Sequence, residues 1–181
     1  MENNFINYMK KMLVIATLAI LASCNSTKGV VSTNWLGKTV TIKSVCPENG
    51  VCTATREPGI ALKEDTNSKG VPKMVANEET ILIKYEFDRK KADGSYADDF
   101  HKEEIFIEIP AKTFKKEYVN EQLQEVKLTF GRHCYCKGSA GYFKITEGTL
   151  KIDNSENKTK VKLNFKAPVP QLFENVEFTV E

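Results

Sequence analysis

Four cysteines in the body of the chain are the residues best suited to carry chemistry. Cys46 and Cys52 flank a five-residue segment, whereas Cys134 and Cys136 flank the single residue Tyr135. In an exported protein an even number of cysteines first indicates disulfide bonds, and four cysteines allow three pairings. In an extended strand the Cα atoms of Cys134 and Cys136 would lie about 6.6–6.8 Å apart, so a bond between them needs a local bend.

Two bridges from the 46–52 segment to the 134–136 segment fit an extended strand better, and we favour this pairing over two local bridges. Each cross-link would close a long loop and stabilise the fold by about 2–4 kcal/mol. The spacing alone leaves both pairings open.

The same cysteines could instead bind a metal ion or react as thiols. Thiolates at Cys134 and Cys136 would suit Cu(I) or Zn²⁺, which prefer soft ligands. Adjacent residues of a strand point to opposite faces, so His133 does not readily join the two cysteines around one ion. That alternation also argues against a nucleophile pair of Cys134 and His133, and it leaves His101 as the remaining base. We therefore expect no metal, no cofactor and no catalytic set, and a protein that is not an enzyme.

A second group of possible metal ligands lies in the acidic segment 93–99. Asp93, Asp98 and Asp99 surround a glycine and could supply oxygen ligands to Ca²⁺. The segment lacks the distal bidentate glutamate of a full calcium loop, so a solvated hairpin tip is the favoured interpretation. The three aspartates are kept as weak metal candidates.

Strands must position these residues, because apolar and polar side chains alternate with a period of two in eight segments. The alternating segments are 39–43, 81–87, 105–109, 126–130, 143–145, 150–152, 160–166 and 176–180. Each places one face of a strand in a core and the other in water. Gly148 interrupts the pattern and predicts a bend or bulge. A short helix is expected over 112–123, where apolar residues fall at roughly helical spacing after Pro110.

This pattern predicts a mainly β protein. Each sheet must bury one face against another, which favours an antiparallel β-sandwich or flattened barrel with at most one short helix. We expect a single all-β domain over 35–181, preceded by a flexible polar tether over 24–34. With 26 basic and 24 acidic residues in 181, the chain has no electrostatic footprint for nucleic acid.

The N-terminal segment has the anatomy of a secretory signal. Lys10 and Lys11 precede the apolar run 12–21, which is too short to span a bilayer, since that takes about 20 apolar residues. The residues Leu21-Ala22-Ser23-Cys24 follow. They resemble the lipobox of bacterial lipoprotein signal peptides.

The resemblance implies that residues 1–23 are removed and that Cys24 becomes the acylated first residue. Two or three acyl chains give a lasting membrane anchor, which one chain does not. In lipoproteins of this kind an aspartate after the cysteine commonly signals retention at the inner membrane. Asn25 stands there in this chain, which favours the outer membrane.

These observations favour a membrane-anchored extracytoplasmic lipoprotein of the cell envelope that acts as a binding or structural module. Its expected partners are the membrane, reached through the lipid anchor, and an envelope protein or small ligand. One alternative is a closed β-barrel that carries a small apolar ligand or lipid. Another is an envelope thiol or metal-binding protein that uses Cys134 and Cys136.

Overall fold

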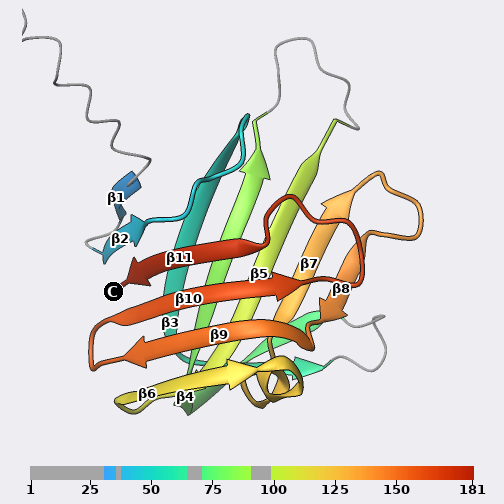
Figure 1. The fold of residues 1–181 in the computed structure, drawn as a ribbon. Helices are drawn as coiled ribbons and strands as arrows, with labels where there is room; N and C mark the ends of the chain where they lie inside the picture. The colour runs from blue at the N-terminus through green and yellow to red at the C-terminus, as the bar shows by residue number, and fades with distance from the viewer. Residues whose placement is uncertain (1–30, 36–37, 65–70, 91–98) are drawn as a thin grey trace, which may run out of the picture.

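Two antiparallel sheets pack face to face in the computed structural model, which describes residues 31–35, 38–64, 71–90 and 99–181 (Figure 1). The six-stranded sheet has the order β1-β2-β11-β10-β9-β6, and the five-stranded sheet has the order β3-β4-β5-β7-β8. The strands of the first sheet are β1 (Val31–Trp35), β2 (Lys38–Ile42), β6 (Phe114–Val119), β9 (Glu147–Asn154), β10 (Thr159–Lys166) and β11 (Asn175–Val180). Those of the second are β3 (Gly50–Glu64), β4 (Pro72–Arg89), β5 (His101–Pro110), β7 (Thr129–Cys134) and β8 (Gly141–Lys144). The prediction of a mainly β sandwich is confirmed.

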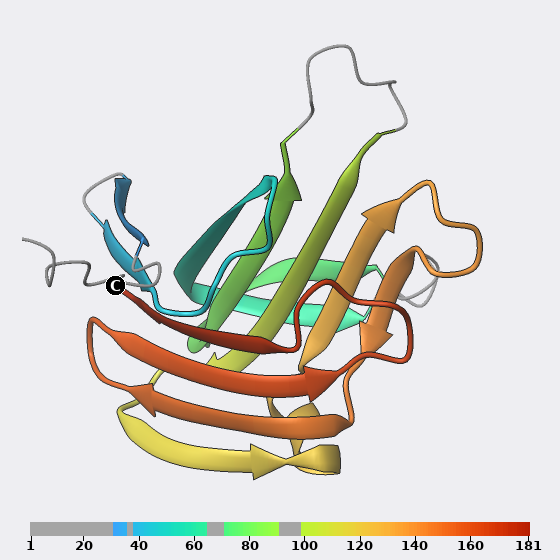
Figure 2. The same ribbon diagram turned by 45° about the horizontal axis from the view of Figure 1, so that its top comes forward.

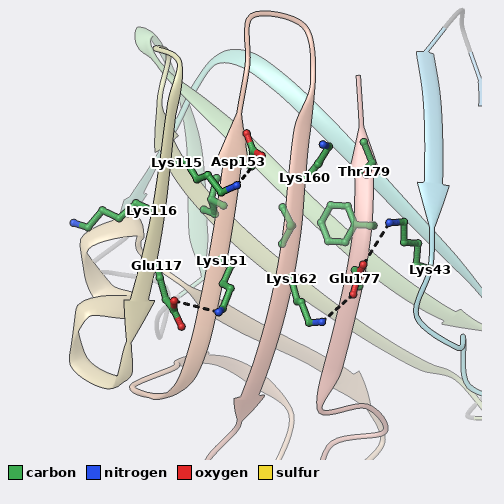
Figure 3. Close-up of a pocket in the computed structure, with 13 residues that line it drawn as sticks. Lys43, Lys115, Lys116, Glu117, Lys151, Asp153, Lys160, Lys162, Glu177 and Thr179 are labelled. Atoms are coloured by element: carbon green, nitrogen blue, oxygen red, sulfur yellow. Dashed lines mark ion pairs between the residues drawn. The ribbon is translucent and has the colours of Figure 1, made fainter.

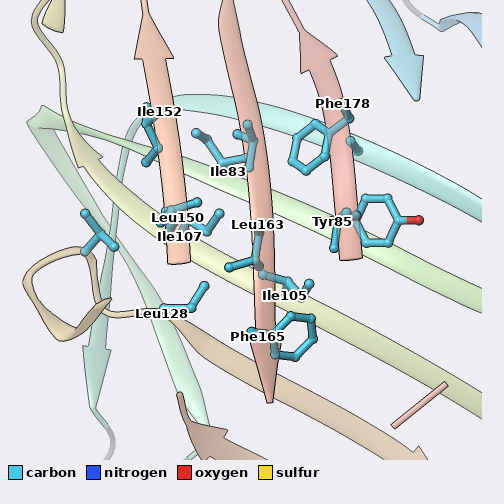
Figure 4. Close-up of a cluster of buried hydrophobic side chains, with 14 of the residues drawn as sticks. Ile83, Tyr85, Ile105, Ile107, Leu128, Leu150, Ile152, Leu163, Phe165 and Phe178 are labelled. Atoms are coloured by element: carbon cyan, nitrogen blue, oxygen red, sulfur yellow. The ribbon is translucent and has the colours of Figure 1, made fainter. Parts of the chain in front are cut away.

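The core lies between the two sheets and consists of the alternating apolar residues of both. Figure 4 shows isoleucines of β4 and β5 facing leucines and phenylalanines of β9, β10 and β11. In β10 the alternation is complete, since every second residue is buried and the residues between them are exposed. Each large apolar side chain buried in this way contributes about 1.5–3 kcal/mol.

An aromatic cluster joins the sheets at one end of this core. The ring of Tyr85, from β4, stacks on Phe178, from β11, with 5.5 Å between centroids, and it meets Phe173 edge-on at 5.4 Å. Burial raises the pKa of Tyr85 to about 12. The phenol therefore stays neutral and is compatible with the core.

The closed barrel considered as an alternative does not fit this arrangement. The described strands form two separate sheets, and large side chains fill the space between them. A carrier would need an enclosed apolar cavity. The interior of the described part of the chain is a packed core instead.

The helix expected over 112–123 is wrong. Residues 114–119 form β6, which pairs with β9, and a 3-10 helix, η1, follows over Asn120–Val126. Lys116 obscures the strand pattern, because this polar residue stands on the same strand face as Tyr118, with its Nζ 4.5 Å from the ring centroid of Tyr118. Leu123 and Val126, three residues apart, are the buried residues of η1. The strand expected over 126–130 accordingly begins at residue 129.

Two further stretches pair although the sequence pattern did not predict strands there. Residues 31–34 of the expected tether belong to β1, which pairs with β2. The signal segment and the tether up to residue 30 lie outside the described residues. β3 is 15 residues long but mixes Thr, Ala, Arg and Pro without alternation, so it carries no period-two signal.

The outer half of the β3–β4 hairpin turns across the outside of the five-stranded sheet (Figure 2). The register shifts between Pro58 and Ile60, where Gly59 adopts a φ of +80°. Beyond this bulge, Leu62 packs on Leu82 and Phe106 of the sheet beneath it. The hairpin therefore covers part of the outer face.

The bend or bulge expected at Gly148 takes a different form. Its pairing with Phe165 continues the ladder between β9 and β10 without a shift. The residue has a φ of +142°, and a Cβ there would lie 2.2 Å from the Asn164 carbonyl oxygen. Glycine is therefore required for close approach of two backbones.

Replacing Gly148 by alanine should destabilise the fold more than the same change at Gly59. At Gly59 an added Cβ meets no atom within 4 Å, so Gly59→Ala carries only the cost of a positive φ, about 1–2 kcal/mol. Gly148→Ala adds a backbone collision to that cost. Urea denaturation of both variants measures the difference, and equal losses would show that the close approach at Gly148 is not real.

Candidate functional site

The cysteines pair locally, as Cys46–Cys52 and Cys134–Cys136, with Cα separations of 5.8 and 5.2 Å. The favoured cross-links between the two segments are wrong. Cys52 lies opposite Phe87 in the sheet, Phe87 opposite Glu103, and Glu103 opposite Arg132. Three steps of about 4.8 Å therefore separate the strands that carry Cys52 and Cys134, which is beyond the reach of any bridge.

The Cys134–Cys136 bridge is made possible by the end of a strand. β7 ends at Cys134, and the chain bends at Tyr135, which brings the two Cα atoms closer than in an extended strand. A tight turn follows, in which the Ser139 N–H donates to the Cys136 carbonyl over 3.2 Å. The local bend that a bond between Cys134 and Cys136 requires is therefore present.

The two bridges differ in what they do for the fold. Cys52 is 7% exposed and belongs to the core, and Cys46 packs against that core. The Cys134–Cys136 bridge closes a loop of only three residues, for which the loop-closure entropy gives about 1.6 kcal/mol of stabilisation, whereas the loop closed by Cys46–Cys52 gives about 2.4 kcal/mol. Its two cysteines are partly exposed, and Tyr135 between them is 79% exposed. Stabilisation is therefore a weak explanation for this bridge.

A buried acid–base pair lies directly beside Cys134. His101 is the residue opposite Cys134 in the β5–β7 ladder, so their side chains share the inner face. The Nε2 atom of His101 lies 2.9 Å from an oxygen of Glu103, which is fully buried. Glu103 also accepts the backbone N–H of Leu172 at 2.9 Å and lies 3.8 Å from the Nε atom of Arg132.

Arg132 connects this pair to the loop that holds the bridge. Its guanidinium donates to the hydroxyl of Ser139 over 2.6 Å, on the far side of the bridge from β7. The side chain is 12% exposed. The bridge, the loop and the buried carboxylate are thus parts of one local structure.

His133 points to the opposite face, as strand alternation predicted. There its Nε2 atom lies 2.7 Å from Glu104, which is 4% exposed. Glu104 also pairs with Lys84 at 2.6 Å and Lys102 at 3.2 Å, and Tyr142 donates to it over 3.4 Å. The structure therefore does not bring His133 together with the cysteines, and that prediction is confirmed.

The electrostatics of this outer cluster favour an ionised carboxylate. Burial by itself raises the pKa of Glu104, but the hydrogen bond from His133 and the charges of Lys84 and Lys102 hold that pKa well below its usual range. Gly131 makes the cluster possible, because a Cβ there would lie 2.8 Å from the ring of Tyr142. The cluster fixes the outer face of β4, β5, β7 and β8.

The aspartate candidates do not form a site in the described part of the chain. Asp93 and Asp98 lie outside the described residues, and Asp99 makes an ion pair with Arg89 at 3.7 Å. No group of three or more His, Cys, Asp or Glu side chains within the described ranges is arranged to hold a metal ion. Nor does any helix within those ranges have the length and apolar character needed to span a membrane.

A basic groove of about 410 Å³ crosses the outer face of the six-stranded sheet (Figure 3). Its charged lining residues come from the end of β2 and from β6, β9, β10 and β11: Lys43, Lys115, Lys116, Glu117, Lys151, Asp153, Lys160, Lys162 and Glu177. All but Lys116, which lies on the same strand face as the buried Tyr118, are outward-facing residues of the strand alternation. Six ammonium groups against three carboxylates make the groove a cationic surface on a nearly neutral protein.

The lysines at the centre of the groove are set by strand register. Lys151 and Lys162 lie directly opposite one another on β9 and β10, and Lys160 lies two residues along the same face. Lys151 pairs outward with Glu117 at 3.2 Å, and Lys162 pairs outward with Glu177 at 3.3 Å. Lys160 makes no ion pair with any residue in the described ranges. The acidic residues therefore lie around a central group of three ammonium ions, those of Lys151, Lys160 and Lys162.

Sequence reasoning found the cysteines and His101 but missed Glu103, Glu104 and the lysine group. The sequence did indicate that these lysines face outward, since they alternate with apolar residues in the predicted strands. What the sequence lacked was the pairing of strands, which decides which charges become neighbours. Comparison with known proteins adds no constraint, since no family model, curated protein or solved structure matches the chain.

Replacing Glu104 by glutamine should destabilise the fold by about 3 kcal/mol near neutral pH, because it breaks a buried network of charges. A carboxyl whose pKa is depressed in the fold stabilises above its unfolded pKa, about 4.3, and loses that contribution as pH falls through the folded pKa. The loss caused by Glu104→Gln should therefore shrink between pH 6 and pH 3.

Urea denaturation of both proteins across that pH range measures the effect. Glu117→Gln is the matched control, because the Glu117–Lys151 pair is exposed and such pairs contribute about 0–1 kcal/mol. A loss from Glu104→Gln that is the same at pH 3 and pH 6 would contradict the assignment.

Proposed function

We propose that the chain is an exported, lipid-anchored protein of the cell envelope whose sandwich binds an anionic carbohydrate on the outer face of its six-stranded sheet. The observation that carries the binding proposal is the central lysine group of the groove. Lys151 and Lys162 face each other across two neighbouring strands, where like charges repel, and each has one carboxylate partner on its outer side, Glu117 or Glu177. A carboxylate or phosphate bound there would remove that repulsion.

The residues around the lysines favour a carbohydrate as the molecule that carries the anionic group. Asp153, Glu117 and Glu177 surround the lysines and would accept hydrogen bonds from sugar hydroxyls. The hydroxyl of Thr179 lines the same groove and can donate or accept. A plain inorganic anion would use the lysines and be repelled by the acids, whereas an acidic sugar uses both.

The size and form of the groove also fit a sugar chain. Its volume of about 410 Å³ lies within the range of about 300–1,000 Å³ typical of ligand sites. It crosses the strands of an exposed sheet face (Figure 3), so an extended polymer could run along it. Binding at exposed lysines is screened by salt, so the affinity should fall as ionic strength rises.

The export part of the proposal is supported by the N-terminal resemblance and by the cysteines. The residues Leu21-Ala22-Ser23-Cys24 resemble a lipobox, and the folded part contains two disulfide bonds. Disulfide bonds persist in oxidising compartments outside the cytoplasm. An anchored protein with a cationic sheet face would meet acidic envelope sugars at high local concentration.

When cells that make the protein are grown with a radiolabelled fatty acid, the protein should carry the label at Cys24 and fractionate with membranes. Cys24→Ala removes the sulfur through which the lipid would be attached, so we expect loss of label and release from the membrane. Ser26→Ala, two residues away, is the control and should keep both. An unlabelled chain, or a Cys24→Ala chain still bound to membranes, would overturn the anchor.

The combined change Lys151→Gln, Lys160→Gln and Lys162→Gln should weaken binding to polygalacturonate at least about tenfold, or about 1.4 kcal/mol. Isothermal titration at two salt concentrations measures it, with neutral dextran as the uncharged comparison. The control variant carries Lys63→Gln, Lys73→Gln and Lys137→Gln, three exposed lysines outside the groove, and changes the net charge equally. Equal weakening in both variants, or equal binding of dextran, would overturn the proposed site.

A further inference from the structure

We propose that the Cys134–Cys136 bridge is a thiol–disulfide exchange site that accepts two electrons from a pair of cysteine thiols in an exported polypeptide. The inference is independent of the lysine groove, which lies on the other sheet. It rests on the placement of the bridge, on the residue opposite Cys134 and on the contrast with the second bridge of the chain.

Access separates the two bridges. Cys52 is buried among core residues, whereas Cys46, which packs against them, is partly exposed, so one sulfur-bearing residue of that bridge is shielded by the core. The Cys134–Cys136 bridge lies past the end of β7, with both cysteines partly exposed. Exposed disulfides are the labile and reactive ones in proteins.

The exposed ring of Tyr135 gives the site a means of holding a polypeptide. It is 79% exposed and lies between the two sulfur-bearing residues, so any chain that contacts the ring is next to the bridge. Tyrosine combines an apolar ring with a polar hydroxyl and is favoured at contact surfaces. Arg132, three residues earlier in the chain, holds this loop in place, because its guanidinium donates to the Ser139 hydroxyl over 2.6 Å.

The buried pair of His101 and Glu103 supplies proton transfer. Glu103 holds the Nε2 atom of His101 at 2.9 Å, which leaves Nδ1 as the ring nitrogen that can exchange a proton. His101 lies opposite Cys134 on the same face, where Cβ atoms of paired residues are about 4.5–5.5 Å apart. The carboxylate is itself held by the Leu172 N–H at 2.9 Å, so the imidazole is fixed in place.

The first thiol of the partner loses its proton, which reaches Nδ1 of the buried His101 by way of water, and its thiolate attacks the sulfur of Cys136, which breaks the Cys134–Cys136 bond. Cys134 leaves as a thiolate and takes the proton from His101. The second thiol of the partner attacks the partner's own sulfur in the mixed disulfide and releases Cys136 as a thiol. The partner gains a disulfide, and the protein holds two thiols.

Differential alkylation with mass spectrometry tests the redox part. The folded protein is equilibrated with increasing dithiothreitol, and each cysteine is labelled when its bridge opens. We expect Cys134 and Cys136 to be labelled at a dithiothreitol concentration at least about tenfold lower than Cys46 and Cys52. Opening of both bridges at the same concentration, or of Cys46–Cys52 first, would overturn the inference.

A reduced synthetic peptide with two cysteines tests the exchange itself. The oxidised protein should convert it to its disulfide form in stoichiometric amount, and the variant with Cys134→Ser and Cys136→Ser should lose this conversion. The matched control carries Cys46→Ser and Cys52→Ser and should keep it, while circular dichroism shows which variants fold.

His101→Gln provides the second readout if a cysteine variant fails to fold. It should slow peptide oxidation at least about tenfold while the bridge still opens at the same dithiothreitol concentration, because the histidine moves a proton and forms no bond to sulfur. An unchanged rate would remove His101 from the mechanism. Peptide oxidation that persists without Cys134 and Cys136 would remove the site.

Discussion

The structure depends on one packing constraint, that each sheet buries a single face against the other. Because side chains alternate along a strand, this constraint divides every strand into residues that fill the core and residues that face outward. The contacts of Tyr85 with Phe178 and Phe173 show how closely the inner faces meet. Most charged groups therefore lie on the two outer faces and at the open ends of the sandwich, and a polar ligand site is expected in one of these places.

Two consecutive residues of β5 illustrate this division. Glu103 points inward at an open end of the sandwich, and Glu104 points outward into a partly covered cluster. The first is held by one backbone N–H, a histidine and an arginine, and the second by two lysines, a histidine and a tyrosine. A buried carboxylate is costly unless it is paired, so both sets of partners are needed for folding. The histidine that contacts Glu103 shares its strand face with Cys134, whereas His133, which contacts Glu104, points to the other face.

The lysine face is different, because it contributes little to stability. Its ion pairs join exposed side chains, as with Lys151 and Glu117, and such pairs are worth about 0–1 kcal/mol. A surface of this kind could lose its charges without unfolding the protein. The like charges on opposite strands are therefore not required by the fold, and the proposed anionic ligand would give them a role.

The sequence predicted the fold class and the core strands because β4, β5, β10 and β11 alternate clearly. It did not predict β3, whose outward and inward residues are both mixed in polarity, or β6, where Lys116 covers an aromatic ring as an apolar residue would. It named the four cysteines and excluded His133 from them by alternation alone. It could not pair them, because pairing follows from the order of strands in the sheet, which places three strand spacings between Cys52 and Cys134.

The positions of the two ends of the sandwich bring the proposals together. β1, where the described chain begins, lies at one side of the molecule, and the loop with Cys134 and Cys136 lies at the other in both views (Figures 1 and 2). A lipid anchor ahead of β1 would attach that first side to the membrane. The exchange site would then face away from the lipid, toward polypeptides in the surrounding compartment. The lysine face, on the outside of the sheet that contains β1, would remain open to envelope sugars beside it.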